Sequence, residues 1–452
     1  MSVRRKEDAP IKRSAKPWAV LLLGATIGCL DQSVRPEPAP APTLAPLVLQ
    51  PNGLSCTEPD ARLSSGALFE VCFNPDRWNR DLVVFIPGHV DPARAPTLPH
   101  GFAADTAVSV LFTKLGYGFA TTSFRGTGLI EPATWIGTDL LELVSTAKTL
   151  LSSSTGRTPR YIYQTGGSQG GLGTVMAVER YPGTFSGGLA VCGPIGDYKK
   201  QIDYVGDFRA VFDYYFAGVI PEWPVWTQDL GANNPGSVDP TSWGAAEQAS
   251  GAALDDPGNA ARIEQVLSVT HAPVDASNPA SIKATAQGIL WYSFRGTNDG
   301  ILKLGGLPFT NVGRVYGGSL DDAALNADVA RFQLTADQAL VAALQTSSHL
   351  RRPLVTIHTT GDPIVPIWHE TLYRRRLDLL GRLLETPITV SRYGHCTFTS
   401  AELLGAFAVL VLKVTGYNLL VPRDVLARPQ EQAQFLRIAR EHGASPTVAP
   451  TP

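Results

Sequence analysis

From residue 66 onward, the apolar positions of this chain follow two alternating patterns. Short apolar or β-branched runs predict strands at 66–73, 81–88, 118–124, 160–165, 186–192, 354–359 and 387–392. Longer stretches with one apolar face predict helices at 104–115, 136–152, 169–181 and 401–414. Apolar strands separated by helices are typical of a mostly parallel sheet that is covered on both faces. The pattern therefore predicts an α/β fold with a mostly parallel central sheet and flanking helices.

The interval between Cys192 and Pro353 breaks this alternation. It contains helical spacings, such as Val205, Phe208 and Phe212, but no convincing series of strands. An insertion of that size is expected to pack as a helical cap over the strand ends, where α/β sheets bind ligands. Its aromatic residues include Tyr214, Phe216, Trp223, Trp226, Trp243, Trp291, Tyr292 and Phe294. We expect most of them to form the core of the cap and a minority to line a site.

The N-terminus has the pattern of an export signal. Basic residues precede an apolar run at 17–28, which is shorter than the ~20 residues of a membrane-spanning helix and fits a secretory signal. Residues 26–29 (Thr-Ile-Gly-Cys) resemble the box before the lipidated cysteine of bacterial lipoproteins, although Thr26 stands where Leu is usual. Cys29 is therefore expected to anchor the protein to a membrane through a lipid, and an ordinary cleavage site is the alternative. Both interpretations predict an exported protein, either secreted or anchored to the bacterial cell envelope.

These patterns divide the chain into five segments. They are a signal peptide (1–28), a Pro/Ala-rich linker (29–52), the first part of the α/β core (53–196), the helical cap (197–352) and the second part of the core (353–452). The linker composition favours an extended tether between the export signal and the folded part.

Composition and charge exclude several classes of function. Lys and Arg number 38 against 40 Asp and Glu, and no basic block lies outside the N-terminus, so nucleic acid is not an expected partner. Hydrophobic residues make up 44%, which excludes a disordered chain. The eight histidines are scattered and none lies in an HExxH or CxxC context. No metal and no organic cofactor is therefore expected.

Four cysteines follow Cys29, an even number for a compartment that is predicted to be oxidising. They are Cys56, Cys72, Cys192 and Cys396. Three pairings are open. The closeness of Cys56 and Cys72 in the first β segment favours that pair, which leaves Cys192 with Cys396. Buried free thiols are the alternative.

The strongest chemical signal is the sequence Gly-Gly-Ser-Gln-Gly at 166–170. It has the G-x-S-x-G spacing, a predicted strand before it and a predicted helix after it, so Ser168 is expected on a strained turn with its hydroxyl exposed above the sheet. A serine nucleophile needs a base, and the base needs a third group to orient it. Asp362 follows the predicted strand 354–359, and His395 follows the strand 387–392. The order Ser, Asp, His is the one expected for this motif.

Other residues compete for these roles. Asp197 follows the strand that precedes the cap and is an alternative acid, and His89, His358 and His369 are alternative bases. Residues 125–128 (Arg-Gly-Thr-Gly) are predicted to form a structural turn rather than to take part in catalysis.

The segments GGSQGG, TGDPIVP and YGHC resemble the nucleophile, acid and histidine loops of the α/β-hydrolase superfamily over about residues 60–420. The resemblance implies that Ser168 attacks, that His395 acts as general base and then acid, and that Asp362 orients its imidazole. It further implies an oxyanion hole formed by the backbone N–H groups of Gln169 and His89, although Pro87 stands where relatives often have His. The chain is therefore identified as similar to serine hydrolases of this superfamily.

Tannases and feruloyl esterases of fungi tie a cysteine near the histidine to one directly before the serine. Gly167 occupies that position here, which argues against a tannase. The aromatic cap favours a small-molecule ester as substrate. A peptide substrate, as in prolyl aminopeptidases or tripeptidyl peptidases, is the alternative, with Asp203, Asp207, Asp213 or Glu222 available to bind its free amine. A binding protein on a degenerate hydrolase scaffold is the remaining reading.

Overall fold

The computed structural model describes residues 46–99, 108–128, 130–220 and 240–449. The predicted signal peptide, Cys29, most of the predicted linker, the start of the predicted helix 104–115, and Glu222, Trp223 and Trp226 lie outside the described residues. Across those four stretches, no helix is both long enough and apolar enough to cross a membrane.

A nine-stranded, mostly parallel sheet forms the core, with the strand order β1-β2-β3-β5-β4-β6-β7-β8-β9. In that order the strands are β1 (Val48–Leu49), β2 (Ser55–Cys56), β3 (Phe69–Phe73), β5 (Gly118–Thr122), β4 (Asp81–Ile86), β6 (Tyr161–Gly167), β7 (Gly187–Val191), β8 (Leu354–Gly361) and β9 (Glu385–Tyr393). All neighbours from β5 to β9 are parallel, whereas β1, β2, β3 and β5 pair antiparallel. The predicted fold class is confirmed. One boundary differs, because β1 lies inside the segment that was predicted to be a linker.

The burial of strand β4 explains the unbroken apolar run from Leu82 to Ile86. Leu82, Val84 and Ile86 belong to the hydrophobic core on one face of the sheet. Val83 and Phe85 belong to the core on the other face. Successive side chains of a strand point to opposite faces, so a strand covered on both sides needs apolar residues at every position.

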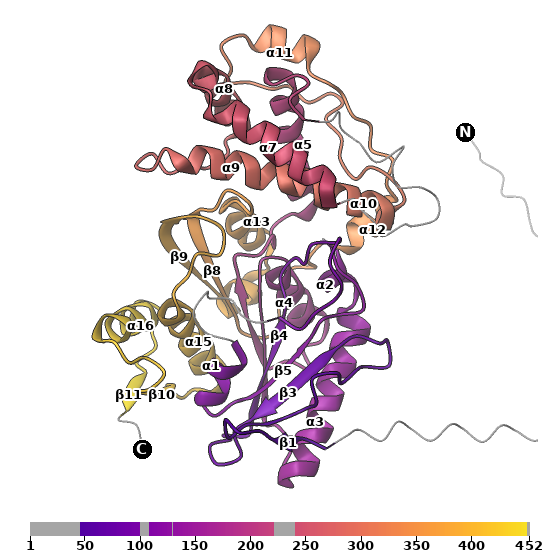
Figure 1. The fold of residues 1–452 in the computed structure, drawn as a ribbon. Helices are drawn as coiled ribbons and strands as arrows, with labels where there is room; N and C mark the ends of the chain where they lie inside the picture. Colours follow the sequence, from indigo (N-terminus) through magenta and orange to yellow (C-terminus); the bar gives the residue numbers. More distant parts are fainter. Residues whose placement is uncertain (1–45, 100–107, 129, 221–239, 450–452) are drawn as a thin grey trace, which may run out of the picture. The chain divides into compact units, whose positions relative to one another are not determined.

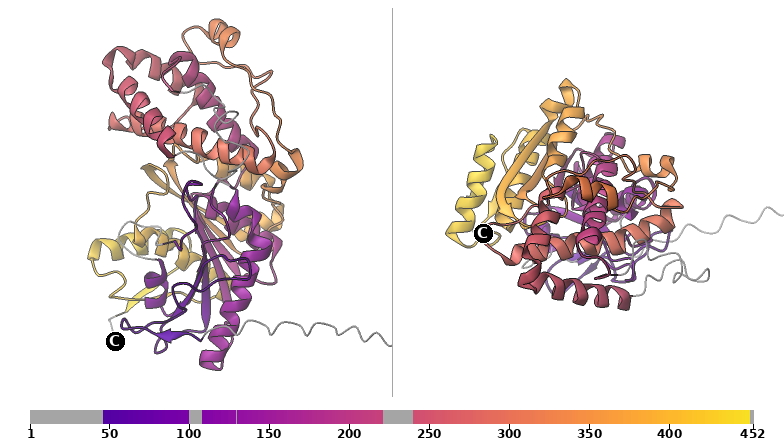
Figure 2. Two further views of the ribbon diagram at one scale, coloured as in Figure 1. Left: turned by 45° about the vertical axis from the view of Figure 1, so that its right-hand side comes forward. Right: turned by 90° about the horizontal axis from the view of Figure 1, so that it is seen from above.

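Two groups of helices cover these faces (Figure 2). Side chains of α3 (Leu141–Thr155) and α4 (Gln169–Arg180) pack into the first core, and side chains of α1 (Val108–Lys114), α15 (Ser400–Thr415) and α16 (Pro429–Glu441) pack into the second. The other elements of this part are α2 (Glu131–Thr134), the π-helical turn η1 (Ile136–Leu140), α13 (Trp368–Arg376), α14 (Leu379–Leu384), β10 (Leu420–Pro422) and β11 (Thr447–Ala449).

The chain between β7 and β8 forms the helical cap (Figure 1). Its elements are α5 (Tyr198–Tyr215), α7 (Pro240–Asp255), η2 (Pro257–Asn259), α8 (Ala260–Thr270), α9 (Ala280–Trp291), the π-helical turn η3 (Tyr292–Gly296), α10 (Thr297–Leu304), α11 (Asp322–Asp328) and α12 (Gln338–Ala343). Phe208, Phe212, Phe216, Trp243 and Phe294 share a buried core within it. Most of the described cap aromatics therefore serve packing, as the sequence predicts.

Candidate active site

Ser168 lies at the sharp turn between β6 and α4. Its backbone has φ 56° and ψ −121°, and residues that carry a side chain rarely adopt such a positive φ. Its backbone N–H donates to the carbonyl of Val191 at 2.8 Å, so the neighbouring strand holds the strained residue in place. Strain of this kind is retained where the surrounding structure fixes it, which is characteristic of functional sites.

The glycines around Ser168 are required by close backbone contacts. A Cβ atom at Gly166 would collide with the carbonyl oxygen of Gly170, and a Cβ at Gly170 would collide with that of Ile86. A Cβ at Gly171 would lie 2.7 Å from the carbonyl oxygen of Val191. The G-x-S-x-G spacing thus reflects the tight fit of this turn between β4, β6 and β7.

Ser168, His395 and Asp362 form a continuous chain of hydrogen bonds. The Ser168 hydroxyl lies 2.9 Å from Nε2 of His395, and Nδ1 of His395 lies 2.7 Å from Oδ2 of Asp362. The three residues come from segments that are 227 and 33 positions apart in sequence. If Nδ1 carries the proton, Nε2 is free to accept the serine proton.

The Asp362 carboxylate is fully buried and fixed by its own loop. Its Oδ1 accepts backbone N–H bonds from Ile364 and Val365, each at 2.9 Å. Burial alone would raise the pKa of Asp362, but His395 and His358 outweigh burial and hold its pKa well below the usual range. Asp362 is therefore an anion at any pH near neutral, as a group that must orient an imidazole has to be.

Two backbone N–H groups belong to residues close to Ser168, one in sequence and one in space. Gln169 follows Ser168 directly, and a Cβ at Gly88 would lie 3.5 Å from the Ser168 Cβ, which brings the next residue, His89, to the same place. Neither N–H donates a hydrogen bond to another described residue. Donors of an oxyanion hole are expected to have this property.

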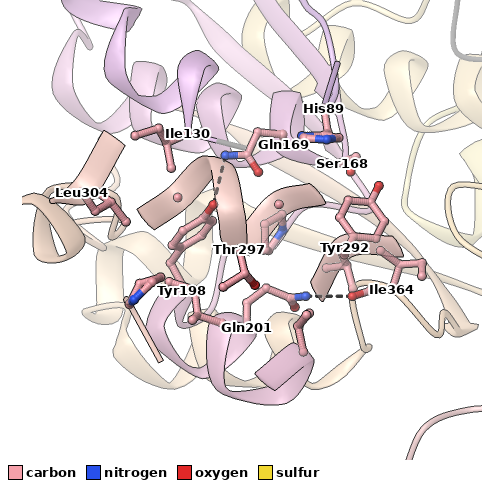
Figure 3. Close-up of a pocket in the computed structure, with 17 residues that line it drawn as sticks. His89, Ile130, Ser168, Gln169, Tyr198, Gln201, Tyr292, Thr297, Leu304 and Ile364 are labelled. Atoms are coloured by element: carbon pink, nitrogen blue, oxygen red, sulfur yellow. Dashed lines mark hydrogen bonds between the residues drawn. The ribbon is translucent and has the colours of Figure 1, made fainter. Parts of the chain in front are cut away.

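A narrow cavity with a volume of about 50 Å³ opens at Ser168 (Figure 3). Its aliphatic lining residues are Ile130, Ile202, Val205, Leu304, Ile364 and Val365. Polar groups come from His89, Gln169, Tyr198, Gln201, Tyr292 and Thr297. No Asp, Glu, Lys or Arg of the described ranges lines it.

The site predicted from the sequence does not include one face of cap helix α5. Tyr198, Gln201, Ile202 and Val205 all line the cavity, and their spacing of three, four and seven residues places them on one side of a helix. Gln201 also donates to the carbonyl of Ile364 at 2.8 Å, and Tyr204 donates to that of Pro363 at 2.7 Å. The helical period alone could have identified this face, although not its contact with the loop of Asp362.

The competing acid and bases have other contacts. Asp197 caps α5 by accepting the backbone N–H of Lys200 at 2.9 Å. His369 accepts the N–H of Gly196 at 3.0 Å and lies 2.8 Å from the Gln201 side chain. His89 lines the cavity, where burial lowers the pKa of its imidazole to about 4. His358 contacts Asp362 rather than the serine.

The predicted turn at 125–128 is structural. The Arg125 side chain bonds the buried carboxylate of Asp139, with Nε 3.1 Å from Oδ1. Gly128 has φ 116°, and a Cβ there would collide with the carboxylate of Asp299 in the cap. These contacts fasten the turn beneath α10.

The acidic residues considered for binding an amine are engaged elsewhere in the cap. Asp203 pairs with Lys199 and Arg314, and Asp207 pairs with Arg314 and accepts from the hydroxyl of Tyr316 at 2.7 Å. Asp213 pairs with Arg209 at 2.7 Å. None of the three lines the cavity at Ser168, and Glu222 lies outside the described residues.

The four cysteines are paired as Cys56 with Cys72 and Cys192 with Cys396. Cys192 directly follows β7, and Cys396 directly follows His395. The second bridge therefore joins the segment that leads into the cap to the histidine loop. Both residues have positive φ, 45° and 54°. Their sulfur atoms lie close enough to His395 to suggest metal ligands, but each sulfur is bonded to the other.

Comparison with known proteins finds only remote similarity. No protein-family model and no curated protein matches the chain. Among solved structures, feruloyl esterase B from Aspergillus oryzae aligns with 11% identity over 80% of each chain and a TM-score of 0.41. Candida Antarctica lipase A aligns with 14% identity over 87% of this chain and 88% of that one, with a TM-score of 0.40. Proline iminopeptidase from Mycobacterium smegmatis aligns with 13% identity over 73% and 89%, with a TM-score of 0.34.

Proposed function

We propose that this chain, which has the α/β-hydrolase fold, is a serine hydrolase that cleaves carboxylic esters through an acyl-enzyme intermediate. The observation that carries the proposal is the unbroken contact from the Ser168 hydroxyl through His395 to Asp362, at 2.9 and 2.7 Å. A serine on a strained turn, a base and a buried anion are the three parts that acyl transfer requires.

The chemistry follows from these positions. The Ser168 oxygen attacks the ester carbonyl while Nε2 of His395 takes its proton, and Asp362 stabilises the imidazolium that forms. The carbonyl oxygen becomes an oxyanion, which the N–H groups of Gln169 and His89 can bind. His395 then returns the proton to the leaving alcohol. Water then attacks the acyl-enzyme while His395 takes its proton. The bond to Ser168 breaks, His395 returns the proton to the serine oxygen, and the carboxylic acid is released.

The cavity favours an ester over a peptide with a free amine. An α-ammonium group needs a carboxylate partner, because burying an unpaired charge is costly. The cavity lining within the described ranges has no carboxylate, and Asp203, Asp207 and Asp213 bind cations of the cap. The small apolar volume suits a short acyl chain. We therefore expect acetyl and butyryl esters to be better substrates than decanoyl esters.

Hydrolysis of p-nitrophenyl esters of increasing acyl length tests the proposal. We expect measurable turnover of the short esters and loss of turnover in Ser168→Ala, with Ser154→Ala, an exposed serine on α3, as the matched control. Rapid cleavage of aminoacyl amides with weak ester turnover would favour the peptidase. Failure of a fluorophosphonate to label the folded protein would favour the binding protein.

We further propose that the protein is exported and anchored through Cys29, as the N-terminal pattern predicts. Expression in a bacterial host with a radiolabelled fatty acid should label the wild-type protein and leave Cys29→Ser unlabelled. An unlabelled wild-type protein that is recovered in the medium would instead indicate an ordinary cleavage site.

A further inference from the structure

A second histidine, His358, contacts the same carboxylate oxygen as His395. Its Nε2 lies 3.5 Å from Oδ2 of Asp362, the oxygen that Nδ1 of His395 approaches to 2.7 Å. The two imidazoles are therefore roughly 6 Å apart or less. His358 lies on β8 and is fully buried, and the reaction as described above does not use it.

Both ring nitrogens of His358 have fixed partners. Nε2 must carry a proton, because it lies 2.7 Å from the carbonyl oxygen of Val365, which can only accept. Nδ1 lies 3.3 Å from Oε1 of Glu370, on α13, and the other oxygen of Glu370 accepts the hydroxyl of Thr356. A ring held between two acceptors is stabilised in its doubly protonated form.

The same contacts hold the loop that carries Asp362. Val365 accepts a bond from His358 at its carbonyl and donates its N–H to Oδ1 of Asp362. The carbonyls of Pro363 and Ile364 are bonded by Tyr204 and Gln201 of the cap helix α5. Three consecutive carbonyls of this loop are thus bonded by side chains. Of these three side chains, only that of His358 can carry a positive charge.

We propose that His358 and Glu370 form a positioning pair that fixes the loop of Asp362 and keeps its carboxylate an anion, so that Asp362 orients His395. The inference rests on the proposed function of Ser168, Asp362 and His395. The positive charge of His358 offsets the carboxylate charge of Asp362 in the resting state, and it raises the electrostatic cost of a second positive charge on His395. Removing the positive charge should therefore make His395 easier to protonate.

The charges around the pair agree with this assignment. Burial alone would lower the pKa of His358, but Asp362 and Glu370 raise its pKa to about 10, so the ring is cationic at neutral pH. The neighbouring His369 has its pKa well below the ordinary value because of burial and the charge of His358. The other titratable groups that face Asp362 or Glu370 are His395, Tyr204, Tyr292, Tyr393 and Glu385.

The test separates the charge from the loop contact. His358→Gln can keep a donor near the Nε2 position for the Val365 carbonyl but cannot carry a charge. We expect the acidic limb of its kcat/KM profile to move to higher pH by about one unit, as for loss of a unit charge at this distance. The double variant His358→Gln/Glu370→Gln removes both charges and should recover at least half of that shift. His349→Gln, at an exposed histidine, is the matched control and should leave the profile unchanged.

NMR titration of the His395 ring, in protein labelled at histidine, measures the midpoint of His395 without a substrate. It therefore tests the positioning proposal even if Ser168→Ala retains full esterase activity and the proposed function fails. An unchanged midpoint in His358→Gln, or a loss of activity at every pH that the double variant does not reverse, would overturn the positioning role. If His358→Gln fails to fold, Glu370→Gln alone carries the test. It removes a negative charge while His358 keeps its contacts with Val365 and Asp362, so the midpoint should shift to lower pH, and an unchanged midpoint would overturn the proposal.

Discussion

Replacing Asp362 with Asn would change one atom and should disable the proton transfer. Oδ1 of Asp362 accepts two backbone N–H groups at 2.9 Å, so an Asn side chain must place its oxygen there and its NH₂ group at the position of Oδ2. The NH₂ group would then donate to Nδ1 of His395. That contact places the imidazole proton on Nε2, which then points at Ser168 and cannot accept the serine proton.

The expected fall in kcat follows from losing the general base function of His395 while the serine and the oxyanion hole remain. An Asp-to-Asn change in the triad of another serine hydrolase lowers kcat by about 10⁴-fold through the wrong tautomer, which corresponds to about 5.5 kcal/mol of transition-state stabilisation. We expect a loss of about 10³- to 10⁴-fold in Asp362→Asn.

Steady-state hydrolysis of p-nitrophenyl acetate, measured with a thermal unfolding scan, checks this expectation. The control is Asp197→Asn, because Asn also serves well as a helix N-cap and Asp197 does not contact the triad. Its turnover should stay within about threefold of wild type. Turnover of Asp362→Asn within tenfold of wild type in a folded protein would refute the assignment of the acid.

Three further predictions concern the turn, the disulfide and the pH dependence of stability. Gly170→Ala should reduce the yield of soluble folded protein or lower the free energy of unfolding by about 3 kcal/mol, because a Cβ there meets the backbone of Ile86. The control Gly183→Ala, where nothing lies within 4 Å, should be near neutral. Equal stability of the two variants would contradict the reasoning. Cys396→Ser should cost about 2–5 kcal/mol and lower kcat, because the bridge joins residues 204 positions apart beside His395; unchanged melting temperature and kcat would reject its role. The raised pKa of His358 predicts a stability contribution that is fully present below pH 6.5 and is lost as pH rises towards about 10. The free energy of unfolding should therefore fall more over that range in wild type than in His358→Gln. Parallel curves of unfolding free energy against pH would argue against a buried cation.

The sequence predicts the central strands, the serine turn and the three triad residues well, because each of them depends on a local sequence pattern. Strand β4 is apolar from Leu82 to Ile86 because both of its faces are buried. The glycines at 166 and 170 indicate a turn that has no room for a side chain. Asp362 and His395 could be found because the carboxyl ends of neighbouring parallel strands meet at one edge of the sheet.

The contacts that surround these elements depend on packing between distant segments, which no local pattern encodes. His358 looks like any residue inside a strand, and its partner Glu370 is identified only when α13 folds back against β8. Gln201 likewise gains its contact with the Ile364 carbonyl from the placement of the cap. The antiparallel strand β1 was missed because two residues within a Pro-rich segment carry no period.

The most direct test of the central claim is to locate the covalent adduct formed with a fluorophosphonate. Mass spectrometry of the digested protein should find one phosphonylated residue, Ser168, at close to one equivalent per chain. The adduct should form much more slowly in His395→Ala and not at all in Ser168→Ala. Labelling of a different residue, or equal labelling of Ser168→Ala and wild type, would contradict the account.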